Sequence, residues 1–239
     1  AVLTSAQAAA LTTSQIQAFS STQIAALTTD ALQGLTSSAI SGLETDDMAT
    51  FDSADILALG TDIIGLNTAD LSLLNAAQAA GLTSSQIQAF SSTQIASLTT
   101  DALQGLTSSA ITGLEAEDIA TFNSADIHAL GTDINGLSNA AAGALTSTQV
   151  NDLSSAQINA LSTALLDALT SSAISGFDST DINAFGSNAV QALGTDINGL
   201  SLDSIAAFST NIAGLTADQI NSFDMDQIDA ISTDALTYL

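Results

Sequence analysis

The chain is built from one short repeat, which limits its possible folds more than any other feature. From Thr4 to Leu239 the sequence divides without remainder into thirty repeats, 26 of eight residues and four of seven. A repeat this short cannot bury a core of its own, so each must be stabilised by its neighbours. The sequence therefore predicts a repeat array. Its four seven-residue repeats are 60–66, 131–137, 194–200 and 209–215.

The positions of the repeat carry a helix-start pattern. Position 8 is always Leu, Ile or Phe, position 5 is always apolar, and position 7 is nearly always small. Position 1 is usually Ser, Thr, Asp or Asn, and position 4 is often Gln or Asp, which together make a capping box. Position 8 of one repeat and position 5 of the next also have the spacing of a hydrophobic staple. We therefore expect one helix to begin in every repeat.

These patterns predict an all-α solenoid of very short helices, each of about six or seven residues. Such helices are unstable alone, so positions 5 and 8, three apart on one helical face, must pack against other repeats. The small residue at position 7 lets another backbone approach. The alternative is a β-solenoid with eight-residue rungs, which suits the Ile, Thr and Ser content. Strands bury alternate positions, so the α-solenoid is favoured, with an unspecified number of helices per coil.

A longer period overlies the short one. Residues 11–66 return as 82–137 with 47 of 56 positions identical, and a third, more diverged copy starts at Thr170. With no linker or break in composition, we expect residues 1–239 to be a single uninterrupted array, cut from or belonging to a longer assembly. Each copy contains a seven-residue repeat opened by glycine, whose freedom in φ predicts a bend there. These glycines are Gly60, Gly131 and Gly194.

The charge balance excludes several classes of function. The chain has 25 acidic residues, one His and no Lys, Arg or Cys, for a net charge of −25. Nucleic-acid binding relies on Lys and Arg, zinc sites rely on Cys and His, and a membrane span needs about 18 or more apolar residues in a row. We therefore expect no nucleic acid, membrane insertion, small-molecule substrate or cofactor. The expected partner is the chain itself, through end-to-end or lateral association.

The residues that could carry chemistry favour a structural interpretation. His128 is the single imidazole and occupies a variable, exposed position, so we expect no catalytic residue and no enzyme. The Ser and Thr side chains are expected to cap helices, and the Phe side chains to fill the core. Clustered carboxylates could bind Ca²⁺ weakly through oxygen ligands, although the favoured role of the acids is to cap helices and keep the array soluble. The weak Ca²⁺ candidates are Asp46, Asp47, Glu117, Asp118, Asp224 and Asp226.

Two repeats carry a family resemblance. Residues 12–19, Thr-Thr-Ser-Gln-Ile-Gln-Ala-Phe, and 20–27, Ser-Ser-Thr-Gln-Ile-Ala-Ala-Leu, resemble the tandem Leu-Thr-x-x-Gln-Ile-x-Ala-Leu tracts of large adhesin-like bacterial surface proteins exported by type I systems. The resemblance implies an exported structural segment. The leading hypothesis is an extracellular stalk, fibre or matrix element. The alternative is an adhesin-type module, or an acidic module that mimics nucleic acid and binds basic proteins.

Overall fold

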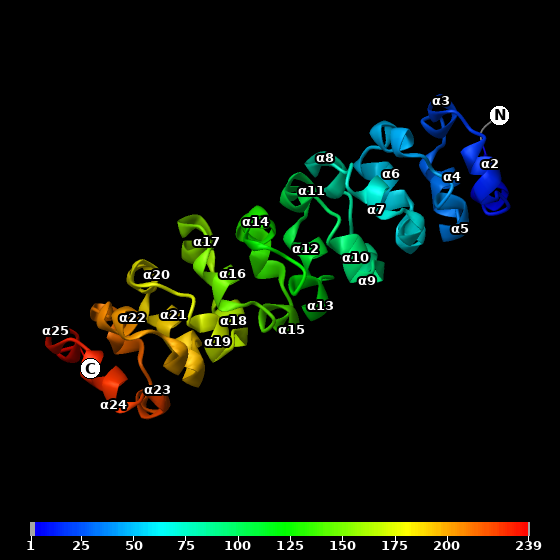
Figure 1. Ribbon diagram of the computed structural model, residues 1–239. Helices are drawn as coiled ribbons and strands as arrows, with labels where there is room; N and C mark the ends of the chain where they lie inside the picture. The colour runs from blue at the N-terminus through cyan, green and yellow to red at the C-terminus, as the bar shows by residue number, and fades with distance from the viewer. Residues whose placement is uncertain (1–2, 239) are drawn as a thin grey trace. The chain divides into compact units, whose positions relative to one another are not determined.

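The computed structural model describes residues 3–238, and within them each of the thirty repeats forms one short helix (Figure 1). Twenty-five are α-helices and five are 3₁₀-helices, while residues 3–238 contain no β-strand. The predicted all-α solenoid of short helices is confirmed, and the β-solenoid alternative is wrong. Leu239, which closes the last repeat in the sequence, lies outside the described residues.

The chain divides into two compact units, one ending at Leu114 and one beginning at Glu115. The first contains α1 (Ser5–Ala8), α2 (Thr13–Gln17), α3 (Ser21–Ile24), α4 (Thr29–Gly34), α5 (Ser37–Ile40), η1 (Thr45–Thr50), α6 (Ser53–Ala58), η2 (Gly60–Gly65), α7 (Thr68–Leu71), α8 (Ala76–Ala79), α9 (Ser84–Ala89), α10 (Ser92–Ile95), α11 (Thr100–Gly105) and α12 (Ser108–Ile111).

The second compact unit contains α13 (Ala116–Ile119), α14 (Ser124–Ala129), η3 (Gly131–Gly136), α15 (Asn139–Ala142), α16 (Ser147–Asn151), α17 (Ser155–Ala160), α18 (Thr163–Ala168), α19 (Ser171–Ile174), α20 (Ser179–Ala184), α21 (Ser187–Ala192), η4 (Gly194–Gly199), α22 (Leu202–Ala206), η5 (Thr210–Gly214), α23 (Ala217–Ser222), α24 (Met225–Ala230) and α25 (Thr233–Leu236).

Each helix begins where the sequence predicts, but ends earlier. In α2, Thr12 Oγ1 accepts the backbone N–H of Gln15 at 3.3 Å, and Gln15 Oε1 accepts that of Thr12 at 2.8 Å, which completes the capping box. The helices have four to six residues, not six or seven. One reason is that positions 8 and 1 are extended at many repeat boundaries, as in Leu35 (φ −66°, ψ 135°) and Thr36 (φ −83°, ψ 156°). Leu59, Leu130 and Leu193, each before a positive-φ glycine, are exceptions. Where both positions are extended, these two residues form the turn between consecutive helices.

Three repeats make one coil of the solenoid. In the first compact unit α1 packs against α4, α2 against α5, and α8 against α11 (Figure 1). In the second, α16 packs against α19 and α18 against α21. The same spacing of three repeats recurs through each compact unit. Every helix therefore lies beside its equivalent in the neighbouring coil, about 24 residues away in sequence.

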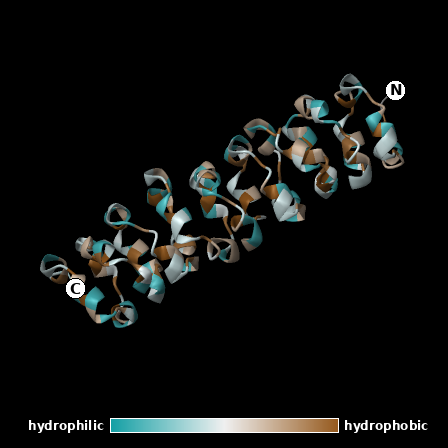
Figure 2. Cartoon of the chain, in the orientation of Figure 1, coloured by the Kyte–Doolittle hydropathy of each residue, from teal (hydrophilic) through white to brown (hydrophobic). Residues whose placement is uncertain are grey.

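Positions 5 and 8 form the core, but they face opposite neighbours. In the first coil Ile16 at position 5 is 0% exposed, while Phe19 at position 8 is only half-buried. In the last coil position 5 is the more exposed of the two. There Ile228 at position 5 is 36% exposed, and Ile231 at position 8 is 6% exposed. The following coil therefore covers position 5, and the preceding coil covers position 8. Figure 2 shows apolar and polar segments alternating along each compact unit.

Glycine meets two separate needs in the array. Gly60 and Gly131 have φ of 53° and Gly194 has φ of 55°, in the left-handed region that glycine reaches without steric cost. At position 7 the need is space, since a Cβ on Gly65 would lie 2.1 Å from the carbonyl oxygen of Ser37 in the preceding coil. The predicted close approach of another backbone at position 7 is thereby confirmed.

Candidate functional site

Successive coils are joined by hydrogen bonds from glutamine side chains at position 4. Each such side chain forms a glutamine bridge, bonded both to its own repeat and to the preceding coil. Gln78 Oε1 accepts the backbone N–H of its own cap residue, Asn75, at 3.0 Å. Its Nε2 donates to the carbonyl oxygens of Met48 at 2.6 Å and Phe51 at 2.9 Å, which lie four repeats earlier. One amide therefore closes its own helix and ties it to the neighbouring coil.

The same bridge recurs in the second compact unit. Gln149 Nε2 donates to the carbonyl oxygens of Ile119 at 3.0 Å and Phe122 at 2.8 Å, again 30 and 27 residues earlier. Both amides are buried, so these hydrogen bonds form away from competing water. Further bridges of this kind to the preceding coil are made by the Nε2 atoms of Gln86, Gln94, Gln157, Gln219 and Gln227.

The sequence reasoning assigned position 4 to helix capping and missed this bridge. A signal was present, because glutamine at position 4 comes in runs of two or three consecutive repeats, each run starting nine repeats after the last. Two of these four runs contain three glutamines, as many as one coil has repeats. The runs are Gln7, Gln15 and Gln23; Gln78, Gln86 and Gln94; Gln149 and Gln157; and Gln219 and Gln227.

Some acids cap a helix of the preceding coil rather than their own. Asp62 Oδ1 accepts the backbone N–H of Ser37 at 2.8 Å, and Asp196 Oδ1 accepts that of Ser171 at 2.9 Å. Each acceptor lies 25 residues after its donor, in the next coil. Because the first N–H groups of a helix have no partner inside it, these carboxylates satisfy them from outside. The predicted capping of an acid's own helix is confirmed instead at Asp52, whose Oδ1 accepts the backbone N–H groups of Ala54 and Asp55.

Asp70 departs from this pattern because its carboxyl group is buried and only half satisfied. It is 1% exposed, and its Oδ2 accepts the backbone N–H of Asn67 at 3.1 Å. Its Oδ1 is buried without a hydrogen-bond partner among residues 3–238. Burial raises the pKa of the Asp70 carboxyl above its ordinary value, the hydrogen bond from Asn67 acts in the opposite direction, and the negative charge of Asp47 raises it further.

The weak Ca²⁺ candidates do not converge into one site. Within the part of the chain that the structure describes, no group of three or more acidic or His side chains is placed to hold a metal ion. In each of the first two pairs one carboxylate points outward and its neighbour is buried in a capping box: Asp46 and Glu117 are exposed, while Asp47 and Asp118 are 3% exposed. Weak Ca²⁺ association stays a prediction. Asp224 and Asp226 are both exposed on the surface of α24.

The remaining candidates take the positions that the sequence predicts. His128 is exposed on α14. Phe side chains fill the core, with Phe177 at 1% exposure packed edge-to-face against Phe185 at a centroid distance of 5.1 Å. Seven of the eight Phe are buried, and Phe19 in the first coil is the half-buried one. No helix within residues 3–238 is both long and apolar enough to cross a membrane.

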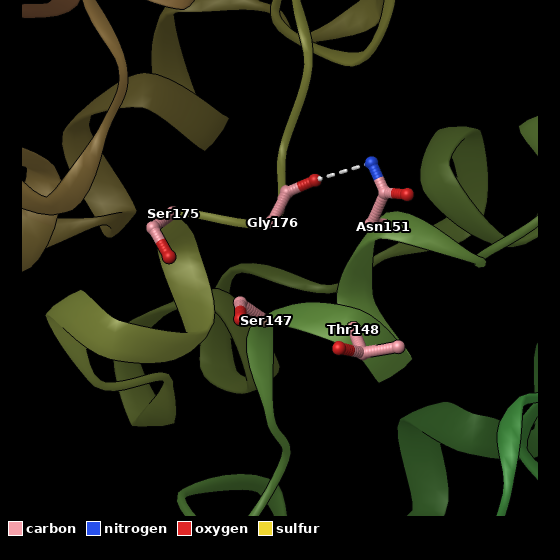
Figure 3. Close-up of a pocket in the computed structure, with 5 residues that line it drawn as sticks. All are labelled: Ser147, Thr148, Asn151, Ser175 and Gly176. Carbon is pink, nitrogen blue, oxygen red and sulfur yellow. Dashed lines mark hydrogen bonds between the residues drawn. The ribbon is translucent and has the colours of Figure 1, made fainter.

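One open hollow lies on the surface of the second compact unit, with a volume of about 280 Å³ (Figure 3). Asn151 Nδ2 donates to the carbonyl oxygen of Gly176 across it at 3.2 Å. The other lining groups are short hydroxyl side chains without a charged residue among them, so the hollow offers hydrogen bonds but no acid, base or nucleophile pair. Its lining residues are Ser147, Thr148, Asn151, Ser175 and Gly176.

Comparison with known families supports a repeat protein. The sequence model of the ALTTAQ repeat matches residues 63–100 of the chain. The matched segment includes the coil of residues 75–98, in which all three repeats carry glutamine at position 4. No curated protein matches the chain.

Proposed function

We propose that this array is an extracellular structural element, a stalk, fibre or matrix component of a bacterial surface, which associates with further copies of itself. The observation that carries the proposal is the uniform contact between coils. Helices three repeats apart pack together throughout each compact unit, so no contact depends on a fixed number of coils. Such a fold is suited to providing length and surface rather than a single cleft.

The composition supports an exported setting. The chain has no Lys or Arg, so it offers no cleavage site to trypsin-like proteases outside a cell. It also has no Cys that oxidation could cross-link. The acids that are not used as caps keep copies soluble by mutual repulsion, which salt screens beyond about 8 to 10 Å at physiological ionic strength.

Electron microscopy of the purified chain, with sedimentation velocity at several protein concentrations, tests the proposal. We expect filaments or lateral bundles that grow with concentration. Because every copy carries a net charge of −25, self-association should strengthen as NaCl is raised. Discrete particles of one size at all salt concentrations would contradict self-association.

The same samples discriminate the alternative of a module that binds basic proteins. Binding to a basic probe such as polylysine relies on opposite charges, so it should weaken as NaCl is raised. Monodisperse particles that bind polylysine in a saturable, one-to-one manner would favour that alternative over a structural fibre.

A further inference from the structure

Asp70 occupies the place where other repeats put a glutamine amide. Its Oδ2 accepts the N–H of its own cap residue, as Gln78 Oε1 does in the next repeat. The other end of the Gln78 amide donates to the carbonyl oxygens of Met48 and Phe51, 30 and 27 residues earlier. In Asp70 the corresponding atom is Oδ1, which is buried and has no hydrogen-bond partner in the described residues.

By its register, Asp70 stands where a glutamine would reach two backbone carbonyl oxygens of the preceding coil. The residues 30 and 27 positions before Asp70 are Ile40 and Leu43, at positions 5 and 8 of their repeat. Both intervals span the seven-residue repeat 60–66, as they do for Gln78, so the two side chains stand in equivalent places. Their carbonyl oxygens are acceptors, and an ionised carboxylate is an acceptor as well. A buried carboxylate in this place would have acceptors around it and no donor for Oδ1.

The charges near Asp70 are all negative. Helix α7 packs against η1 and α10. Glu44, Asp46 and Asp47 are the ionisable groups of η1 and its cap, while α10 and its flanking residues 91–98 carry none. The chain has no Lys or Arg, and His128 belongs to the other compact unit. No positive side chain of this unit can therefore balance an Asp70 carboxylate.

We propose that Asp70 holds a proton in the folded chain and donates it from Oδ1 to the backbone carbonyl oxygens of Ile40 and Leu43, which makes this residue a pH-dependent clamp between two coils. A neutral carboxyl group is the acid equivalent of the glutamine amide, with one acceptor oxygen and one donor. The direction of its pKa shift, upward through burial, agrees with this assignment.

The pH dependence follows from linkage. A carboxyl group whose pKa is higher in the folded than in the unfolded state stabilises the fold when it is protonated. This stabilisation is complete below the unfolded pKa, ordinarily about 3.9 for Asp, and is lost as the pH rises through the folded pKa. The hydrogen bonds donated by Asp70 therefore stabilise the contact between the coils most in acid, and less at neutral pH.

The test is Asp70→Asn, in which the side chain keeps its acceptor oxygen and carries a donor at every pH. Urea unfolding of the full chain is followed from pH 3.5 to pH 7.5 for both proteins. We expect equal midpoints at the acid end, and a variant midpoint that exceeds the wild-type midpoint increasingly toward neutral pH. The matched control is Asp55→Asn, which removes the same charge from a partly exposed capping box and should not reproduce the rise of the variant midpoint over the wild type toward neutral pH.

A direct reading comes from the carboxyl ¹³C resonance of Asp70, assigned by its loss in Asp70→Asn. It should titrate with a midpoint above the ordinary value for Asp. A midpoint at or below that value, or a variant gap independent of pH, would overturn the proposal. The proposal would also be overturned if CaCl₂, added at neutral pH and fixed ionic strength, raised the urea unfolding midpoint of the wild type but not that of Asp70→Asn. A bound cation, and not a proton, would then balance the Asp70 carboxylate.

Discussion

Two successive coils of the first compact unit, residues 52–74 and 75–98, bury position 5 in the same way and differ in the residue type at position 4. In both, the position 5 side chains are at most 1% exposed, and the first residue caps the helix with its side chain or, at Gly60, with a left-handed turn. Position 4, the residue before the buried one, differs. It is Asp55, Asp62 and Asp70 in the first coil and Gln78, Gln86 and Gln94 in the second.

The difference shows that position 4 decides how a coil is tied to its neighbour. Glutamine accepts within its own repeat and donates to the coil before it, whereas an ionised aspartate can only accept. Asp62 therefore serves as an acceptor for a free helix N–H in the preceding coil, while Asp70 has no such donor for Oδ1. Because both coils bury position 5 alike, substitutions at position 5 measure the packing energy, and substitutions at position 4 measure the energy of the hydrogen bonds between coils.

The largest expected effect falls on the shared core. Ile63→Ala and Ile87→Ala each remove a side chain that is 0% exposed, one from each coil. Both should lower the free energy of unfolding by about 2–5 kcal/mol, through lost burial and the cavity left behind. Urea unfolding measures both, and a large difference between the two variants would show that the coils do not share one packing plan. Ile228→Ala, at a half-exposed position, is the control and should cost much less.

The next effect concerns the close approach at position 7. A Cβ on Gly65 or Gly81 would lie 2.1 Å or 2.0 Å from a backbone carbonyl oxygen of the preceding coil. Gly65→Ala and Gly81→Ala should therefore each cost about 1–3 kcal/mol through overpacking. Gly186→Ala is the control, because its Cβ would meet nothing within 4 Å. Thermal unfolding that leaves both tight-site variants as stable as this control would contradict the packing described.

An effect of similar size to that of the glycine variants is expected when the hydrogen bonds of one glutamine bridge are removed. Gln86→Glu preserves the shape and the acceptor toward Thr83, but removes the donor that reaches the carbonyl oxygens of Ile56 and Gly60. At neutral pH it should lower the free energy of unfolding by about 1–3 kcal/mol, and the loss should shrink in acid as the new carboxyl group takes up a proton. Gln15→Glu is its control, since Gln15 lies in the first coil and is exposed. Equal losses in the two variants would show that the bridge adds no stability.

Local signals allowed much of the fold to be predicted. Thr12 and Gln15 interact within a single repeat, so their spacing alone specifies the helix start. The positive φ of Gly60 followed from one missing residue beside a glycine. The exposure of His128 and the burial of Phe177 followed from variable and apolar positions of the repeat.

Contacts between coils were not predictable in the same way. The bond from Gln78 to Met48 joins residues 30 apart, and its partner is a backbone carbonyl that any residue would supply. Identifying it requires the number of repeats per coil, which depends on small turn angles added over three repeats. The burial of Asp70 Oδ1 was not predicted from its own repeat either.

The sequence by itself determined the length of the repeat, the start of every helix, the apolar positions and the three glycines that adopt positive φ, because each depends on residues close together in the chain. Only the tertiary structure decided that three repeats close a coil, that helices stop after four to six residues, and that positions 5 and 8 face opposite neighbours. These features depend on how each coil packs on the next. The backbone carbonyl groups in that contact are supplied by every residue type, so the sequence does not mark which of them accept hydrogen bonds.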